Sequence, residues 1–311
     1  LLRKNTMIPK TLMLPFLSLL LLISSLVNAN ELEVGSITTV TLGELHPTQP
    51  AIGYDQVYYK LGRFQADPKK QFDEICEANG QKGVSHFNTG SMPNIPSSFQ
   101  CDEAVGTEKQ AMKTIVIAPN GQYYLTDGHH TFNAFWQMRN GGKQFKVKVV
   151  VAKDYRALPT MTAFWKAMVK DGNTWLQNST GHTITYQHLP TSLGMANFEN
   201  DKYRSVMYYS RNVGWDKPNY PVPFLEFYWS KEVRKDIDLN RYDLTSAKGY
   251  RQAITDVSHY LLNMKSDNIG GSGKTAKEMG QFESFNQKGL TKLFNAKKGK
   301  VTYMLAYKNS L

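Results

Sequence analysis

The 311-residue sequence predicts an α+β fold, in which a small α/β unit with a β-hairpin is followed by a mostly helical C-terminal half. Up to about residue 154, short β-branched and aromatic runs alternate with helical patterns and turn residues. Two of these runs flank Pro119-Asn120-Gly121, an arrangement typical of a hairpin. Beyond residue 156 the apolar residues recur mainly at helical spacing. We therefore expect an α/β domain over residues 30–155 and a helical region over 156–311 packed on it.

Residues 1–29 have the pattern of a secretory signal peptide. Arg3, Lys4 and Lys10 precede an uncharged apolar run over residues 12–27, and a small-residue cleavage site ends at Ala29. This order is typical of export signals, although an uncleaved anchor would share its first two parts. No later segment is apolar enough to cross a membrane. We therefore expect a secreted or periplasmic protein with no integral membrane segment after signal cleavage.

Each element of the first half follows from its local pattern. Val57, Leu61 and Phe64 recur at helical spacing, and Asn140-Gly141-Gly142 is a typical end for a second helix. Lys and Val alternate from residue 146 onward, as on a half-buried strand. The predicted elements are a strand at 36–45, helices at 53–65 and 69–78, hairpin strands at 115–117 and 122–125, a helix at 129–139 and a strand at 146–151.

The second half consists of amphipathic segments. In the clearest one, apolar residues from Tyr250 to Met264 fall on a single stripe. The tail over 275–298 is rich in lysine, and we expect it to form a basic surface helix. The predicted helices of this half span 159–170, 201–211, 223–236, 247–265 and 275–298.

Two cysteines, Cys76 and Cys101, are separated by 25 positions. In an oxidising compartment we expect them to form one disulfide, worth roughly 3 kcal/mol on the chain-entropy account. The stretch between them is rich in Gly, Pro, Ser and Asn, so a covalent link would help to order it. No CxxC spacing or close histidine pair accompanies them, which argues against zinc.

The chain is basic. Its 37 Lys and Arg against 26 Asp and Glu give a net charge of +11, and removal of the three basic residues of the signal segment leaves 34 against 26, or +8. Such a surplus suits a polyanionic partner such as nucleic acid. A basic balance of this size does not by itself assign one.

The most informative segment is Asp127-Gly128-His129-His130-Thr131, where an apolar strand runs into a turn and then into a helix. The first N–H groups of a helix lack intrahelical partners, and together with the helix dipole they form an anion-binding site. Histidine can carry a proton to or from a phosphate oxygen near neutral pH. The junction is therefore the candidate catalytic and phosphate-binding site.

The residue types suggest a role for each position of this junction. Asp127 can cap the helix or hold an imidazole N–H, and Gly128 is suited to a positive φ or to close backbone approach. We expect one of His129 and His130 to contact the ligand as general base for water and the other to bond the scaffold. The helix dipole should lower their pKa values and favour neutral rings. Thr131 and backbone N–H groups would hold the developing oxyanion.

Further ligand contacts come from other segments. The candidate second contacts to phosphate, all from early in the chain, are Gln49, Lys60 and Arg63. The cofactor stays unknown, because a divalent metal would need Asp127, one or both adjacent histidines and a further ligand such as His86 or Glu226. No HxH or HExxH spacing supports such a set.

Two stretches, Pro47-x-Gln49-Pro50 and residues 127–131, resemble the ParB/sulfiredoxin superfamily, and four stretches resemble its ParB-like nuclease branch. They are residues 47–57 (PTQPAIGYDQV), 127–136 (DGHHTFNAFW), 203–205 (YRS) and 223–229 (PFLEFYW). In that superfamily the strand–Asp-Gly–helix junction binds the phosphates of a nucleotide or of a substrate. The resemblance therefore implies a small α/β core with a phosphate-facing pocket, in which His130 stands at the position of a phosphate contact.

At positions 129–131 the chain differs from two branches of the superfamily, and these differences exclude the reactions of those branches. A sulfiredoxin would carry a catalytic cysteine where this chain has His129, so sulfinic-acid repair is not expected. Partitioning ParB proteins carry a Glu and two Arg over positions 129–131, and the charges that hold a CTP triphosphate are missing here. Arg204 and Glu226 match positions of the nuclease branch, where they either support the site or simply pair between two helices.

The leading hypothesis is an exported hydrolase of phosphodiester bonds that acts on a phosphate-containing ligand such as nucleic acid. Two alternatives stay open, a non-catalytic phosphate or polyanion binder and a nucleotide-dependent phosphotransferase on the same scaffold. Turnover of phosphodiesters would separate the hydrolase from the binder, and the phosphotransferase would require nucleotide binding.

Overall fold

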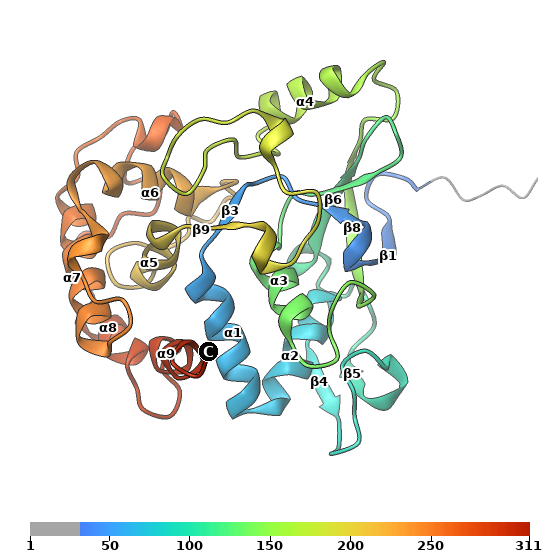
Figure 1. Cartoon of the computed structure of the whole chain (residues 1–311), viewed down its shortest axis with the longest axis horizontal. Helices are drawn as coiled ribbons and strands as arrows, with labels where there is room; N and C mark the ends of the chain where they lie inside the picture. Colours follow the sequence, from blue (N-terminus) through green and yellow to red (C-terminus); the bar gives the residue numbers. More distant parts are fainter. Residues whose placement is uncertain (1–31) are drawn as a thin grey trace, which may run out of the picture. The chain divides into compact units, whose positions relative to one another are not determined.

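Five strands build the central sheet, in the order β1-β8-β6-β7-β2 (Figure 1). The computed structural model describes residues 32–311, so the predicted signal peptide at 1–29 lies outside the described residues. The sheet is mixed, because β1–β8 and β6–β7 are antiparallel whereas β6–β8 and β2–β7 are parallel. Its strands are β1 (Ile37–Thr41), β2 (Leu45–His46), β6 (Lys113–Ile117), β7 (Tyr123–Leu125) and β8 (Lys146–Asp154).

The predicted hairpin is the β6–β7 pair. Between the strands, the Ala118 N–H donates to the Gln122 carbonyl and the Gly121 N–H to the Ala118 carbonyl, both at 2.9 Å. Gly121 has a φ of +79°, a conformation that glycine adopts without strain. Asn120 closes the turn by accepting the Gln122 N–H on its side chain at 3.1 Å. The turn sends β7 toward the Asp-Gly-His-His junction.

Three helices share the core of the sheet: α1 (Tyr54–Ala66), α2 (Pro68–Ala78) and α3 (His129–Gln137). All three occur where the sequence predicts a helix. Val57, Leu61 and Phe64 of α1 are buried against sheet residues, as their spacing predicts. The first half is therefore an α/β unit, with its helices packed on a small mixed sheet.

The disulfide between Cys76 and Cys101 confirms the prediction from cysteine count and compartment. It links α2 to β5 with a Cα–Cα distance of 5.6 Å. Strand β4 (Gly83–His86) pairs antiparallel with β5 (Gln100–Asp102), apart from the central sheet. The glycine- and serine-rich stretch is thus held at both ends, by the bond and by the strand pair.

Six helices make up the second half; the first packs against sheet residues, and the other five enclose a second apolar core. Trp215, Trp229, Tyr209 and Tyr250 are completely buried in it. The apolar stripe of the longest helix faces this core, as its spacing predicts. The helices are α4 (Met161–Lys170), α5 (Lys202–Ser210), α6 (Leu225–Asp236), α7 (Ala247–Asn263), α8 (Gln287–Leu293) and α9 (Lys300–Lys308).

Helix α1 lies between the two cores and touches both halves of the chain (Figure 1). Its Tyr59 belongs to the helical core, and α9 crosses it closely, since a Cβ on Gly62 would lie 2.1 Å from the Tyr303 carbonyl oxygen. Just before α1, strand β3 (Ala51–Ile52) pairs in parallel with β9 (Glu199–Asn200). Residues 32–311 cluster as one compact unit, and the boundary between residues 155 and 156 stays a prediction.

The structure confirms the α+β class but corrects the tail. The single helix predicted over 275–298 is wrong, because this range contains turns followed by α8 alone, and α9 comes after it. Gly280 has a φ of +87°, and a Cβ there would lie 1.7 Å from the Asp216 carbonyl oxygen, so the chain turns where the helix was expected. Within residues 32–311, no helix has the length and apolarity that a membrane span requires.

Candidate functional site

The strand–helix junction presents three free backbone N–H groups. Helix α3 begins after Gly128, whose carbonyl accepts the first helical hydrogen bond, from the Phe132 N–H at 2.9 Å. Among the described residues, no hydrogen bond uses the N–H groups of His129, His130 or Thr131. Gly128 has a φ of +102°, and a Cβ there would lie 2.6 Å from the Lys113 side chain. The positive φ, one of the two alternatives predicted for this position, is confirmed.

Both histidines are buried and both bond the same neighbouring segment. His129 is 3% exposed, and its Nε2 accepts the Thr48 N–H at 3.2 Å. His130 is 8% exposed, and its Nε2 accepts the Gly53 N–H at 3.0 Å. The stretches 47–57 and 127–136, which carry the superfamily resemblance, are thus in direct contact. From the sequence we expect one histidine to contact the ligand and the other to bond the scaffold. In the structure, each histidine bonds the scaffold through its Nε2.

These bonds fix the protonation of the two rings. A backbone N–H can only donate, so each Nε2 carries a lone pair and each neutral ring carries its hydrogen on Nδ1. Burial lowers the pKa of His129 to about 4, against the opposing effect of the Asp127 carboxylate. Burial, reinforced by the Arg204 charge, also lowers the pKa of His130 well below its usual value. Both rings are therefore expected to be neutral near pH 7, with burial and not the helix dipole as the main cause.

The same bonds restrict the chemistry of the histidines. A ring whose lone pair accepts a backbone N–H cannot take a proton from water until that bond breaks. Each Nδ1–H remains a donor, and within residues 32–311 neither has a hydrogen-bond partner. The arrangement therefore suits two neutral hydrogen-bond donors better than a general base.

Asp127 does not cap the helix, and this alternative from the sequence is wrong. Gly128 is the N-cap residue of α3 and receives no side-chain cap. The Asp127 side chain is 65% exposed and pairs with Lys113 Nζ at 3.3 Å. Its carboxylate therefore lies at the solvent side of the junction, paired with a lysine of β6.

A cavity of about 820 Å³ opens in front of the junction and receives side chains from both halves of the chain. Gln49, Gly128 and Thr131 line it, as the sequence predicts for residues close to one site. Five basic residues face three acidic ones on its walls. The charged lining residues are Lys60, Lys113, Arg204, Arg211, Lys217, Glu74, Asp127 and Glu226.

The side chains of Gln49, Lys60 and Arg63, the predicted second contacts to phosphate, already form hydrogen bonds or ion pairs with other protein groups. Lys60 and Arg63 both form ion pairs with Glu74, a residue that the sequence did not single out. Arg63 is absent from the cavity lining, whereas Lys60 belongs to it. The Gln49 amide donates to the Ala51 carbonyl at 2.8 Å. Gln49 and Lys60 thus lie near the candidate site. Arg63 does not line the cavity and shares the Glu74 carboxylate with Lys60.

Arg204 on α5 and Glu226 on α6 form a buried pair across the cavity wall, at 3.6 Å. Although burial alone would raise it, the Arg204, Lys217 and Arg211 charges hold the pKa of Glu226 below its usual value. Arg204 is only 6% exposed, yet its Nε and Nη1 have no hydrogen-bond partner in the described part of the chain. Two buried guanidinium nitrogens without acceptors are costly unless an anion supplies them.

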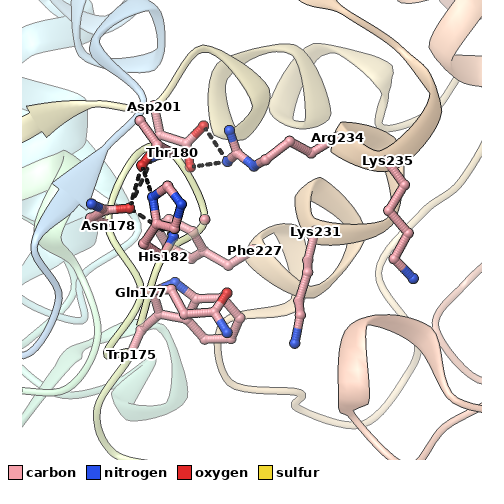
Figure 2. A pocket seen from close by; sticks show the side chains of 11 residues that line it. Trp175, Gln177, Asn178, Thr180, His182, Asp201, Phe227, Lys231, Arg234 and Lys235 are labelled. Atoms are coloured by element: carbon pink, nitrogen blue, oxygen red, sulfur yellow. Dashed lines mark hydrogen bonds and ion pairs between the residues drawn. The ribbon is translucent and has the colours of Figure 1, made fainter. Parts of the chain in front are cut away.

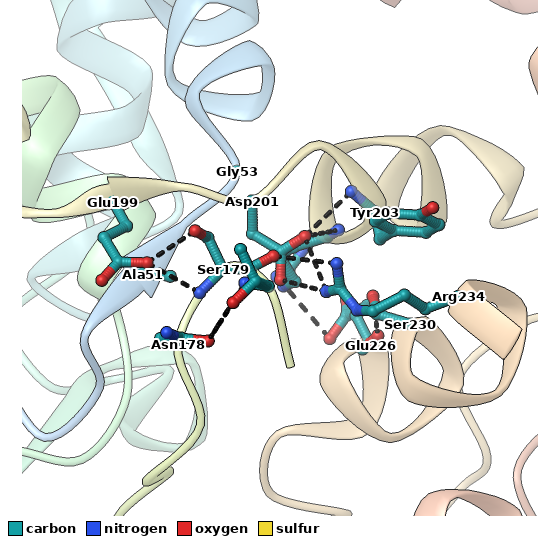
Figure 3. A network of polar contacts seen from close by, with 12 residues as sticks. Ala51, Gly53, Asn178, Ser179, Glu199, Asp201, Tyr203, Glu226, Ser230 and Arg234 are labelled. Atoms are coloured by element: carbon teal, nitrogen blue, oxygen red, sulfur yellow. Dashed lines mark hydrogen bonds and ion pairs between the residues drawn. The ribbon is translucent and has the colours of Figure 1, made fainter. Parts of the chain in front are cut away.

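A polar network around Asp201 orders the start of α5, the helix that carries Arg204 (Figure 3). Asp201 begins α5 by accepting the N–H groups of Tyr203 and Arg204, at 2.9 and 3.1 Å. Arg234 of α6 donates to both oxygens of the same carboxylate, at 3.2 and 3.1 Å. One carboxylate therefore caps α5 and holds α6 beside it, which places Arg204 and Glu226 on facing helices.

A second cavity, of about 300 Å³, lies behind Phe227, which lines both (Figure 2). Most of its basic residues already form ion pairs within the protein. Arg234 pairs with Asp201, and Lys235 pairs with Glu232 at 2.5 Å. Of the lysines and arginines that line this cavity, Lys231 alone forms no ion pair within residues 32–311. The larger cavity is therefore the better candidate for an anionic ligand.

The metal set proposed from the sequence is not assembled. His86 lies in β4 and is absent from the lining of the cavity. The Nε2 atoms of the two junction histidines already accept backbone N–H groups. Within residues 32–311, no three His, Cys, Asp or Glu residues lie close enough together to hold a metal ion.

Comparisons with known proteins identify a family and a similar fold. No curated protein sequence matches the chain. Among solved structures, protein Atu1540 from Agrobacterium tumefaciens has a similar fold, with a TM-score of 0.50 and 18% identity over 72% of this chain and 90% of that one. The family described as "Putative ParB-like nuclease" matches residues 38–235, which include all four stretches singled out above. The chain belongs to this family.

Proposed function

We propose that the protein hydrolyses phosphodiester bonds and that the scissile phosphate binds between the N-terminus of α3 and Arg204. The observation that carries this proposal is the buried Arg204 guanidinium, whose Nε and Nη1 lack acceptors while it lines the same cavity as three free N–H groups. Membership of a nuclease-like family supports the reaction class.

The donors around this position suit a phosphodiester. Backbone N–H groups at a helix start and a guanidinium are the groups that most often hold phosphate oxygens. The His129 and His130 rings would add two neutral Nδ1–H donors. Because charge on the non-bridging oxygens changes as water attacks, donors fixed in advance stabilise the transition state without having to reorganise.

Glu226 is the residue we propose as general base. Nearby cations keep its carboxylate ionised beside Arg204. A water held by Glu226 would attack phosphorus and pass its proton to the carboxylate, while the bond from phosphorus to the leaving oxygen breaks. The leaving oxygen would take a proton from solvent. The histidines would then stabilise charge and not transfer protons.

We also propose that the protein acts after export. Residues 1–29 have the composition of a signal peptide, and the Cys76–Cys101 disulfide is of a kind that persists in oxidising compartments. A substrate available there would be DNA or RNA outside the cytoplasm, which fits the basic net charge.

The rival function is a phosphate or polyanion binder without turnover. It is favoured by one observation, the engagement of both histidine lone pairs by backbone N–H groups. On this account the cavity keeps the anion-binding groups and lacks a histidine base.

One activity screen separates the two. The chain with and without residues 1–29 is incubated with single-stranded DNA, double-stranded DNA, RNA and bis(p-nitrophenyl) phosphate, in the presence of Mg²⁺ or EDTA. Hydrolysis that is lost in Glu226→Gln and in Arg204→Met/Glu226→Gln, but kept in Lys231→Met of the second cavity, supports the hydrolase. Salt-sensitive binding without hydrolysis under every condition supports the binder.

A further inference from the structure

Three elements bring basic residues together at one side of the main cavity. Lys60 comes from α1, Arg211 directly follows α5, and Lys300 is the first residue of α9. The Arg211 guanidinium lies 5.4 Å and the Lys300 ammonium 5.0 Å from the centre of the Tyr208 ring. Tyr208, Arg211 and Lys60 line the cavity, and Lys300, which is not among its lining residues, lies against the ring of Tyr208.

The carboxylates nearby do not balance these charges. Glu74 pairs with Lys60 and, from behind, with Arg63. In the described part of the chain, neither Arg211 nor Lys300 forms an ion pair, and their side chains make cation–π contacts instead. With Arg63 included, four cations therefore lie near one paired carboxylate, that of Glu74. Asp216 is the other acidic residue whose charge acts on Lys300.

The surroundings of Lys300 are unfavourable for a charged ammonium. Burial, reinforced by the charges of Arg211, Lys60 and Arg63 and opposed by that of Asp216, lowers its pKa to about 8. The aromatic rings that face it, Tyr59 and Tyr208, supply no formal charge. A cluster of like charges in a partly buried place is relieved by a bound anion.

This cluster is distinct from the phosphate position at α3. The charges of Arg204 and Lys60 act on His130, whereas those of Arg211, Lys60 and Arg63 act on Lys300. Lys60 is common to both sets, and the charge of Arg211 also acts on Glu226, so the two positions adjoin one another. The cavity, at about 820 Å³, exceeds what one phosphate group fills.

We propose that Arg211 and Lys300, with Lys60 beside them, form a second phosphate subsite, so that the cavity takes two neighbouring phosphates of a nucleic-acid strand. This inference rests on the proposed function, since it adds an adjacent position to the phosphate site at α3. The ligand class that it names is an oligonucleotide, not a small phosphate monoester. Each phosphate seated on basic groups adds to affinity and to salt dependence.

The test compares two probes that differ by one phosphate. Thymidine dinucleotide TpT has one phosphodiester and the trinucleotide TpTpT has two. For Arg211→Met and Lys300→Met we expect TpTpT to bind about tenfold more weakly, with a log–log salt slope smaller by about 0.7. TpT binding should change less than twofold in both variants. Lys298→Met, an exposed lysine just ahead of α9, is the matched control and should change neither probe.

The outcomes separate this subsite from the primary site. Equal weakening of TpT and TpTpT in Arg211→Met and Lys300→Met, or no weakening at all, would overturn the second subsite. Persistence of TpT binding in Arg204→Met/Glu226→Gln would instead overturn the primary position, whatever the first comparison gives. The two proposals can therefore fail separately.

Proton linkage gives a second readout. Because a bound phosphate favours the charged lysine, TpTpT binding at pH 8.5 should be accompanied by proton uptake, measured by calorimetry in two buffers of different ionisation enthalpy. The uptake should disappear in Lys300→Met and persist in Lys298→Met. Uptake that is unchanged in Lys300→Met would contradict the placement of phosphate beside this residue.

Discussion

His130 accepts the backbone N–H of Gly53 at 3.0 Å, and this bond joins the first turns of two helices. Gly53 is the N-cap residue of α1, and His130 is the second residue of α3. A Cβ on Gly53 would lie 2.7 Å from the Ser205 hydroxyl of α5, so three helices meet at this point. His130 therefore supports the cavity wall as well as lining it, and a loss of activity on its replacement would not identify a catalytic group.

Replacement of His130 separates support from chemistry. His130→Ala leaves the buried Gly53 N–H without an acceptor and opens a cavity, so we expect a loss of about 2–4 kcal/mol in the free energy of unfolding. His130→Gln can keep an acceptor near the Nε2 position and should lose less than half as much. Urea denaturation of the three proteins measures both values. Equal stability of the alanine and glutamine variants would show that the Gly53 bond contributes little.

The buried His129 predicts a pH dependence of stability. Its pKa is about 4 in the folded protein against 6.5 in the unfolded chain, so folding favours the neutral ring. This contribution is complete above pH 6.5 and is lost as the pH falls toward 4, by roughly 3 kcal/mol in total. Comparison with His129→Gln at pH 7 and pH 4.5 isolates it. The variant should show a flatter decline, and an identical decline would contradict the prediction.

The sequence predicted the parts of the site that depend on local chemistry. The Asp-Gly step after an apolar strand located the start of α3, and the positive φ of Gly128 follows from its lack of a side chain. The apolar stripe of α7 and the single cysteine pair were equally local signals. Features of this kind depend mainly on the residue types in a short segment of sequence, and for this reason they could be predicted.

The rest of the site depends on tertiary placement. Arg211 and Lys300 meet over Tyr208 although 89 positions separate them, and no motif marks either residue. The backbone N–H groups that donate to the histidines are likewise set by packing, because Thr48 lies 81 positions before His129. Strands of two residues, such as β3 and β9, are too short to show a periodicity.

Gly128 should tolerate no side chain, for two separable reasons. Alanine there would be strained at a φ of +102°, and its Cβ would meet the Lys113 side chain at 2.6 Å. We expect Gly128→Ala to lose about 2–3 kcal/mol in the free energy of unfolding. In a Lys113→Ala background the same change should lose about 1 kcal/mol less, because the close contacts with Cγ and Cδ of Lys113 are removed while the backbone strain and a contact with Cβ remain. Additive losses in the double variant would show that the lysine simply moves aside.

Inorganic phosphate should stabilise the folded protein through Arg204. An anion that binds the folded state at ten times its dissociation constant adds about 1.4 kcal/mol, which raises the Tm of a chain of this size by roughly 3 °C. The paired variant Arg204→Met/Glu226→Gln removes the unpartnered donors without leaving a buried charge alone, so the rise should vanish. Glu226→Gln alone should increase it, because a negative charge beside the anion is removed.

Thermal unfolding in phosphate, with sodium chloride at matched ionic strength as reference, measures these shifts. Lys231→Met in the second cavity is the control, since it should keep the full rise and so accounts for any general effect of phosphate on protein stability. If the paired variant were stabilised by phosphate as much as the unaltered chain, the anion would bind elsewhere. The buried guanidinium of Arg204 would then need another explanation for its unpartnered nitrogens.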